Sequence, residues 1–115
     1  MTSSNATCRE VGAVTIVDLS GPLMLGESIS VLCRAISHLV GKQRSKIILN
    51  FRNVSEIESV GVGELVAAYT AVRNCEGRLK LLSPPKKICD MLELTKLSKI
   101  LEVYTKEELA LCSFE

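Results

Sequence analysis

One short segment near the middle of the chain constrains the fold more than any other. In Lys46-Ile47-Ile48-Leu49-Asn50-Phe51, nearly every residue after the lysine is apolar. An apolar run without polar alternation is typical of a parallel strand that is covered on both faces. The segment therefore predicts a central strand in a sheet with other elements packed against both sides.

Strand-like and helix-like segments alternate around this strand. Further strands are expected at 7–10, 14–19, 79–82 and 100–104, and Ser20-Gly21-Pro22 is expected to end the second of them, with 54–59 as a connecting segment after the central strand. Apolar residues at helical spacing predict helices over 29–40 and about 61–76, and Pro84-Pro85 opens a third. Thr105-x-x-Glu108 is a capping-box pattern, which predicts a short C-terminal helix.

The resulting order is β-β-α-β-α-β-α-β-α. Because strands joined through helices run parallel, it predicts an α/β fold with a mixed, mostly parallel sheet of four to five strands and four helices. The 115 residues suffice for one hydrophobic core but not for two. We expect a flexible N-terminus over 1–6 and a single domain over 7–115.

Composition excludes several classes of partner. Lys plus Arg is 14 and Asp plus Glu is 13, and this balance argues against a nucleic-acid-binding protein, which normally carries a basic excess. Two Phe, two Tyr and no Trp leave few platforms for stacking bases. The chain has neither a bilayer-length apolar run nor a secretory signal pattern, so we expect a cytoplasmic protein without a membrane segment.

The residue pattern does not support a catalytic site or a metal site. The five cysteines are widely spaced and only one histidine is present, so no zinc-binding spacing occurs. We expect the cysteines to be reduced, buried thiols. Because no nucleophile–base pair and no complete phosphate loop can be found, an enzyme is the least favoured class, and no catalytic residue, metal or cofactor is expected.

The most informative stretch is Glu58-Ser59-Val60-Gly61-Val62-Gly63. Ser59 lies where a loop meets a predicted helix, and the two glycines leave room for a partner to approach. Free N–H groups and the positive end of a helix dipole favour a phosphate at such a point. Two interpretations follow from the residues alone: Ser59 caps the helix, or Ser59 accepts a phosphate.

The order of elements and this stretch together resemble the STAS domain of anti-sigma factor antagonists. In that family the motif Asp-Ser-Ser/Thr-Gly-Leu-Gly follows the central strand, and its first serine is the phosphoacceptor. Ser59 falls on that position, and the resemblance implies that the flanking residues 58 and 60–63 (Glu58, Val60, Gly61, Val62 and Gly63) contact a partner. The likeness extends from about Val14 to Leu111.

The resemblance implies a partner-switching cycle and no enzymatic activity of the chain itself. The unmodified protein binds an anti-sigma factor that is a serine kinase, and so frees a sigma factor. The kinase phosphorylates Ser59, binding is lost, and a serine phosphatase restores it. ATP belongs to the kinase, so the resemblance implies no cofactor here.

Several residues depart from the family pattern. Glu58 replaces aspartate, Val60 replaces the second hydroxyl residue, and Met24 stands where the family often has aspartate. Val60 and Met24 favour an alternative hypothesis, a STAS module that is not phosphorylated and serves as a fixed subunit of a larger signalling or transport complex. The apolar loop Leu23-Met24-Leu25 is either a partner contact or buried under the next helix.

Overall fold

The computed structural model describes residues 5–23, 27–57 and 59–114. Its elements follow the predicted order: β1 (Asn5–Val11), β2 (Val14–Leu23), α1 (Glu27–Gly41), β3 (Lys46–Ile57), α2 (Ser59–Asn74), β4 (Arg78–Leu82), α3 (Lys86–Leu94), the 3₁₀ turn η1 (Leu97–Lys99), β5 (Val103–Tyr104) and α4 (Glu107–Cys112).

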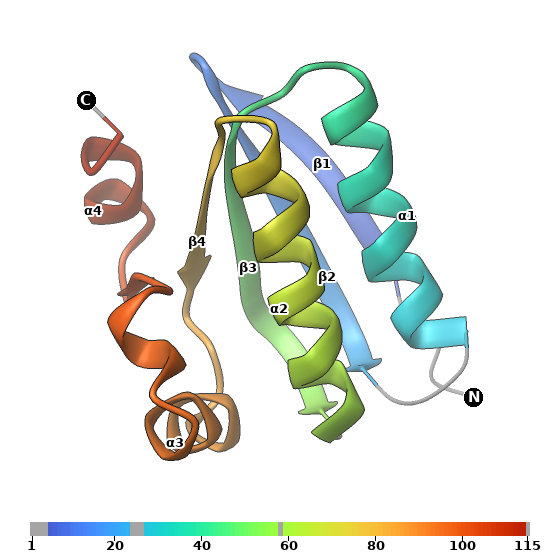
Figure 1. The fold of residues 1–115 in the computed structure, drawn as a ribbon, viewed down its shortest axis with the longest axis vertical. Coiled ribbons are helices and arrows are strands. Elements are labelled where there is room, and N and C mark those ends of the chain that lie inside the picture. The colour runs from blue at the N-terminus through green and yellow to red at the C-terminus, as the bar shows by residue number, and fades with distance from the viewer. Residues whose placement is uncertain (1–4, 24–26, 58, 115) are drawn as a thin grey trace.

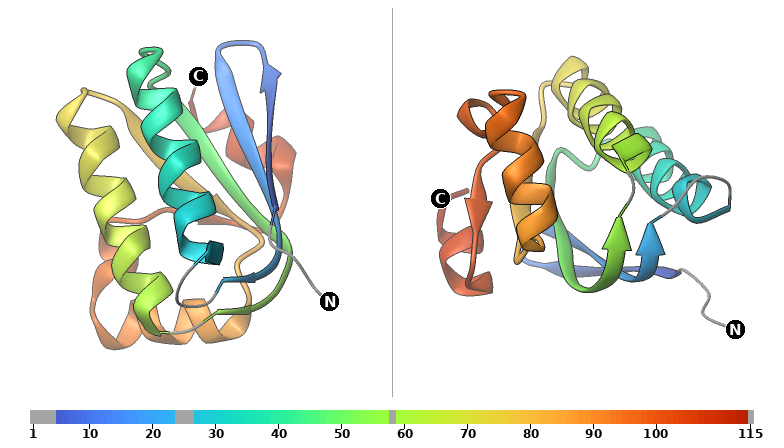
Figure 2. Two further views of the ribbon diagram at one scale, coloured as in Figure 1. Left: turned by 90° about the vertical axis from the view of Figure 1, so that its right-hand side faces the viewer. Right: turned by 90° about the horizontal axis from the view of Figure 1, so that it is seen from below.

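The five strands form one mixed sheet in the order β1-β2-β3-β4-β5. β1 runs antiparallel to β2, and the other neighbouring pairs are parallel. Helices α1 and α2 lie side by side on one face of the sheet (Figure 1). Helix α4 lies on the opposite face, as the view from below in Figure 2 shows. The predicted α/β architecture is confirmed.

β3 sends alternate side chains into two separate cores. Ile47, Leu49 and Phe51 join the larger cluster beneath α1 and α2, whereas Ile48 joins a smaller cluster beneath α4. Each of these side chains is at most 1 % exposed. Because both faces are covered, apolar residues are required at consecutive positions, which confirms the prediction of a central strand.

The smaller cluster consists of Val14, Ile16, Ile48, Leu82, Ala110 and Phe114. A buried lysine packs beside it. Lys80 of β4 is only 2 % exposed, and its Nζ donates to the carbonyl oxygen of Ser113 at 3.1 Å and to the Ser113 hydroxyl at 2.9 Å. The same ammonium lies 4.5 Å from the ring centroid of Phe114 and 3.2 Å from Glu102. Lys80 therefore fastens the end of α4 to the sheet.

β2 and β3 are both longer than the sequence predicts. β2 passes through Ser20-Gly21-Pro22 to Leu23, and β3 continues to Ile57. The two extensions pair with each other, with register irregularities on both sides of Gly21. Gly21 has a φ of 82°, which glycine adopts without strain, so the strand bends instead of ending. The expected break, and the expected connecting segment over 54–59, are wrong.

Three predicted details near the termini are also wrong. β1 begins at Asn5, two residues before the expected start of the first strand. The last strand spans only Val103–Tyr104, because the preceding residues form η1 and an irregular turn. Thr105 does not cap α4: the N-cap residue is Lys106, in an extended conformation and without a side-chain capping bond.

The cysteines are free but not buried. Cys8, Cys75 and Cys112 are exposed, and Cys33 and Cys89 are partly buried. The expectation of buried thiols is therefore wrong. Among the described residues, no helix combines the length and apolarity that a bilayer span requires.

Candidate functional site

The ends of β2 and β3 bring two predicted site regions together. Leu23, the last residue of β2, pairs in register with Ile57, the last residue of β3. Helix α2 then begins at Ser59. The start of the apolar loop and the Ser59 motif therefore lie at the same edge of the sheet, the lower edge in Figure 1. Met24, Leu25 and Glu58 lie outside the described residues.

Ser59 is the first residue of α2, two residues earlier than the predicted helix start. Gly61 and Gly63 consequently lie inside the helix and not before it. The backbone N–H groups of a first helical turn have no partner within the helix, and the first turn of α2 carries no acidic side chain. A negative group is therefore favoured here. The side chains of residues 55–62, Val60 and Val62 among them, lie outside the described part of the chain.

Gly63 faces open space. A Cβ added at this position would meet no atom within 4 Å, leaving aside its chain neighbours and the nearby backbone of α2. Glycine within a helix costs about 1 kcal/mol relative to alanine, because it loses more backbone freedom on folding. No close neighbour among the described residues requires a glycine here. The fold therefore tolerates a side chain at this position.

A hydrogen bond between a thiol of α1 and a carboxylate of α2 joins the two helices. The Sγ–H of Cys33 donates to Oε2 of Glu64 at 2.9 Å. This hydrogen bond to a carboxylate, together with burial and the nearby negative charge, raises the pKa of the Cys33 thiol to about 11. Cys33 is therefore held as a neutral thiol, which makes it a poor nucleophile.

The family model of the STAS domain matches residues 5–110. The chain belongs to the STAS domain family. An anti-sigma F factor antagonist from Paenibacillus polymyxa is 26 % identical over 102 residues, which cover 89 % of this chain and 87 % of that protein.

Solved structures share the fold of this STAS domain. A candidate anti-sigma factor antagonist from Thermotoga maritima matches with a TM-score of 0.85 and 24 % identity, covering 94 % of this chain and 92 % of that one. The Bacillus cell fate determinant SpoIIAA in its phosphorylated form matches with a TM-score of 0.78 and 21 % identity, covering 96 % and 99 %. These likenesses confirm the architecture.

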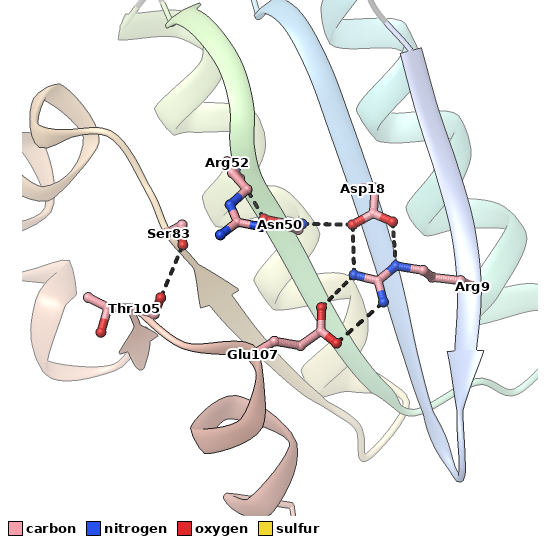
Figure 3. Close-up of polar contacts among 7 residues, drawn as sticks. All are labelled: Arg9, Asp18, Asn50, Arg52, Ser83, Thr105 and Glu107. Atoms are coloured by element: carbon pink, nitrogen blue, oxygen red, sulfur yellow. Dashed lines mark hydrogen bonds and ion pairs between the residues drawn. The ribbon is translucent and has the colours of Figure 1, made fainter.

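A polar cluster lies on the face of the STAS sheet opposite α1 and α2 (Figure 3). Nε of Arg9 donates to Oδ2 of Asp18 at 2.5 Å, and Nη2 of Arg9 donates to Oε1 of Glu107 at 2.5 Å. Nδ2 of Asn50 donates to Oδ1 of Asp18 at 2.7 Å. We call Arg9, Asp18, Asn50 and Glu107 the polar cluster. It ties β1, β2 and β3 to the beginning of α4.

The charges of the polar cluster perturb one another. The Arg9 guanidinium lowers the pKa of the Asp18 carboxyl, although partial burial opposes this effect. The two carboxylates in turn raise the pKa of Arg9. Sequence reasoning missed the cluster. The sequence feature that could have revealed the cluster is Asp18. It shares a strand face with Val14 and Ile16 and so interrupts a row of apolar residues.

Proposed function

We propose that this STAS domain is an anti-sigma factor antagonist whose partner binding is controlled by phosphorylation of Ser59. The unmodified domain binds an anti-sigma factor that is a serine kinase. Phosphorylation by that kinase ends the interaction, and a serine phosphatase restores it. The domain itself acts as a cytoplasmic binding module and not as an enzyme. The observation that carries the proposal is the position of Ser59 as the first residue of α2, at the edge where β2 and β3 end.

The physical basis is the charge that phosphorylation adds. A phosphoserine carries about −1.5 to −2 charges at neutral pH. The start of a 16-residue helix accommodates that charge within the domain, because its free N–H groups and its dipole attract anions. A partner surface that fits the neutral serine would instead have to desolvate a dianion without pairing it. Such a mismatch costs several kcal/mol and is sufficient to release a docked protein.

Two comparisons support the proposal. The Paenibacillus polymyxa relative carries the name anti-sigma F factor antagonist. The fold of SpoIIAA has been solved in a phosphorylated form, so this architecture accepts a phosphate in at least that protein. We further propose that Glu58, Val60, Gly61, Val62 and Gly63 contact the kinase, together with the loop formed by Leu23, Met24 and Leu25.

The test compares partner binding by Ser59 variants. Purified serine-kinase anti-sigma factors from the source genome are immobilised, and binding of the wild type, Ser59→Ala and Ser59→Asp is measured by biolayer interferometry. We expect Ser59→Ala to bind as the wild type does and Ser59→Asp to bind at least tenfold more weakly. Ser45→Asp is the matched control, because Ser45 is exposed and precedes β3 at the opposite edge of the sheet. Equal binding by all four proteins would refute the charge switch.

Intact-mass measurement separates this proposal from the unphosphorylated-subunit hypothesis. The wild type is incubated with the kinase and ATP, and the mass increase of one phosphate is expected, which Ser59→Ala should not show. Stable binding to the kinase without any mass increase would instead favour a fixed subunit of a larger complex.

A further inference from the structure

A pocket of about 430 Å³ opens between the tip of the β1–β2 hairpin and the end of α4. It is lined by hairpin residues 11–14, by Lys46 at the start of β3, by Leu111 of α4 and by Phe114 just after that helix. We call this space the hairpin pocket. The hairpin tip lies at the upper edge of the sheet in Figure 1, whereas Ser59 begins α2 at the lower edge. The pocket is therefore separate from the Ser59 motif.

The hairpin pocket is a place where the smaller core cluster opens to solvent. Val14 and Phe114 belong to that cluster, and Leu111 packs against it. The six residues of α4 do not cover Val11, which pairs with Val14 in register and is 38 % exposed. A hydrocarbon group that enters the pocket would cover this apolar surface and continue the core, which is favourable in water.

Lys46 is the one charged residue in the lining of the hairpin pocket. Its side chain lies on the α4 face of the sheet, because the next residue, Ile47, joins the cluster beneath α1 and α2. Lys46 forms no ion pair with any described residue. Glu10, just before the lining residues of β1, points to the opposite face and pairs with Arg44. The described lining therefore presents one uncompensated positive charge beside an apolar surface.

This lining selects the class of ligand. A carboxylate can accept a charge-assisted hydrogen bond from the lysine, whereas a cation is repelled by it. A ligand with a polar body would lose hydration against the apolar walls without regaining hydrogen bonds. An apolar cavity of about 150 Å³ is enough to hold benzene, so 430 Å³ has room for a longer hydrocarbon. We propose that the hairpin pocket binds a free medium-chain fatty acid, with its alkyl chain against Val11 and Leu111 and its carboxylate on Lys46.

Binding is tested by NMR titration of the full-length, ¹⁵N-labelled protein with octanoate below its micelle concentration. Saturable shifts are expected for the amide signals of Gly12, Ala13, Lys46 and Leu111. Two probes separate the halves of the ligand: 1-octanol keeps the chain without the charge, and acetate keeps the charge without the chain. Both should bind at least tenfold more weakly than octanoate.

Three outcomes of this titration would overturn the proposal. The first is the absence of saturable shifts with octanoate. The second is binding of 1-octanol or acetate as tight as that of octanoate, because either the charge or the chain would then be irrelevant. The third is a set of shifts at these residues that follows protein concentration instead of octanoate, because a second copy of the chain would then occupy the pocket.

Matched variants locate the site. Lys46→Gln should weaken octanoate binding about tenfold, because it removes a charged hydrogen bond, and should leave the binding of 1-octanol unchanged. Lys42→Gln removes an exposed charge just after α1, outside the lining, and should change neither. Val11→Thr replaces a lining methyl group with a hydroxyl group and should weaken octanoate binding about threefold. Val103→Thr is its control, because Val103 of β5 is also 38 % exposed but does not line the pocket.

The substituted side chains are partly or fully exposed, so the variants should keep the wild-type spectrum away from the substitution. Unchanged octanoate affinity in Lys46→Gln or in Val11→Thr would refute the site. The proposal does not depend on phosphorylation of Ser59, and Ser59→Ala should bind octanoate as the wild type does.

Discussion

Replacing Gly63 with alanine tests whether this glycine serves the fold or a partner. Gly63 is the fifth residue of α2, and an added Cβ would meet no atom within 4 Å. Glycine in a helix is about 0.8–1 kcal/mol less favourable than alanine, and no steric cost offsets this difference here. We expect the free energy of unfolding to rise by about 0.5–1 kcal/mol, which corresponds to an increase in Tm of roughly 2–6 °C.

The assay is urea unfolding followed by far-ultraviolet circular dichroism, with the midpoint and the m value fitted separately. Two glycines supply matched controls. Gly41, the last residue of α1, also faces open space, so Gly41→Ala should be neutral or mildly stabilising. A Cβ at Gly77 would lie 2.6 Å from the carbonyl oxygen of Ser45 and 2.8 Å from Cγ1 of Val72, so Gly77→Ala should destabilise the protein.

Partner binding completes this test. If a partner packs against the start of α2, Gly63→Ala should bind the kinase more weakly than the wild type although it is more stable, and Gly41→Ala should bind normally. A loss of stability in Gly63→Ala would show that the site is not open as described. A gain in stability with unchanged binding would show that no partner approaches this position.

Three further predictions concern groups outside the Ser59 motif. Lys80→Ala should lower the free energy of unfolding by about 2–4 kcal/mol in urea melts, because it leaves a cavity and removes the hydrogen bonds to the end of α4. Lys80→Met keeps the volume of the side chain and should lower the free energy of unfolding by about 1 kcal/mol or less. Equal losses in the two variants would contradict this account. In a variant that keeps only Cys33, Glu64→Gln should raise the rate of reaction with a thiol reagent at pH 8 by about tenfold. The substitution removes the carboxylate whose hydrogen bond and charge, together with burial, raise the thiol pKa to about 11. An unchanged rate would exclude the carboxylate as a cause. Asp18 has a lowered pKa in the folded state, so it stabilises the fold above the pKa of an unfolded aspartate, about 3.9, and this contribution is lost as the pH falls through the folded value. Asp18→Asn should therefore flatten the decline of the urea midpoint between pH 5 and pH 2, and a slope identical to that of the wild type would refute the assignment.

Local patterns were enough to predict the order of elements. The apolar run at β3 required cover on both faces, and the helical spacing over α1 and α2 required one face to pack against the sheet. Ser59 could be placed near a helix start because the glycine-rich motif and the amphipathic pattern meet there. These features depend on near neighbours in the chain, which a sequence displays directly.

Features that depend on register escaped prediction. Gly21-Pro22 is a strong local signal for the end of a strand. β2 nevertheless continues past these residues, because Leu23 pairs with Ile57 of β3. Thr105 matches a capping pattern, yet the N-cap falls on Lys106. In both cases the tertiary partner, here β3 or the sheet beneath α4, contributes more free energy than the local preference of a single residue.

The amino-acid sequence by itself determined the α/β class, the alternation around β3 and the place of Ser59 near the start of a helix, because hydrophobic periodicity acts over a few residues. Only the tertiary structure decided that Arg9 meets Asp18 and Glu107, and that β4 stops short of the end of β3. Contacts between residues 9 and 107 depend on strand register and on how α4 packs, and a linear pattern carries no record of either.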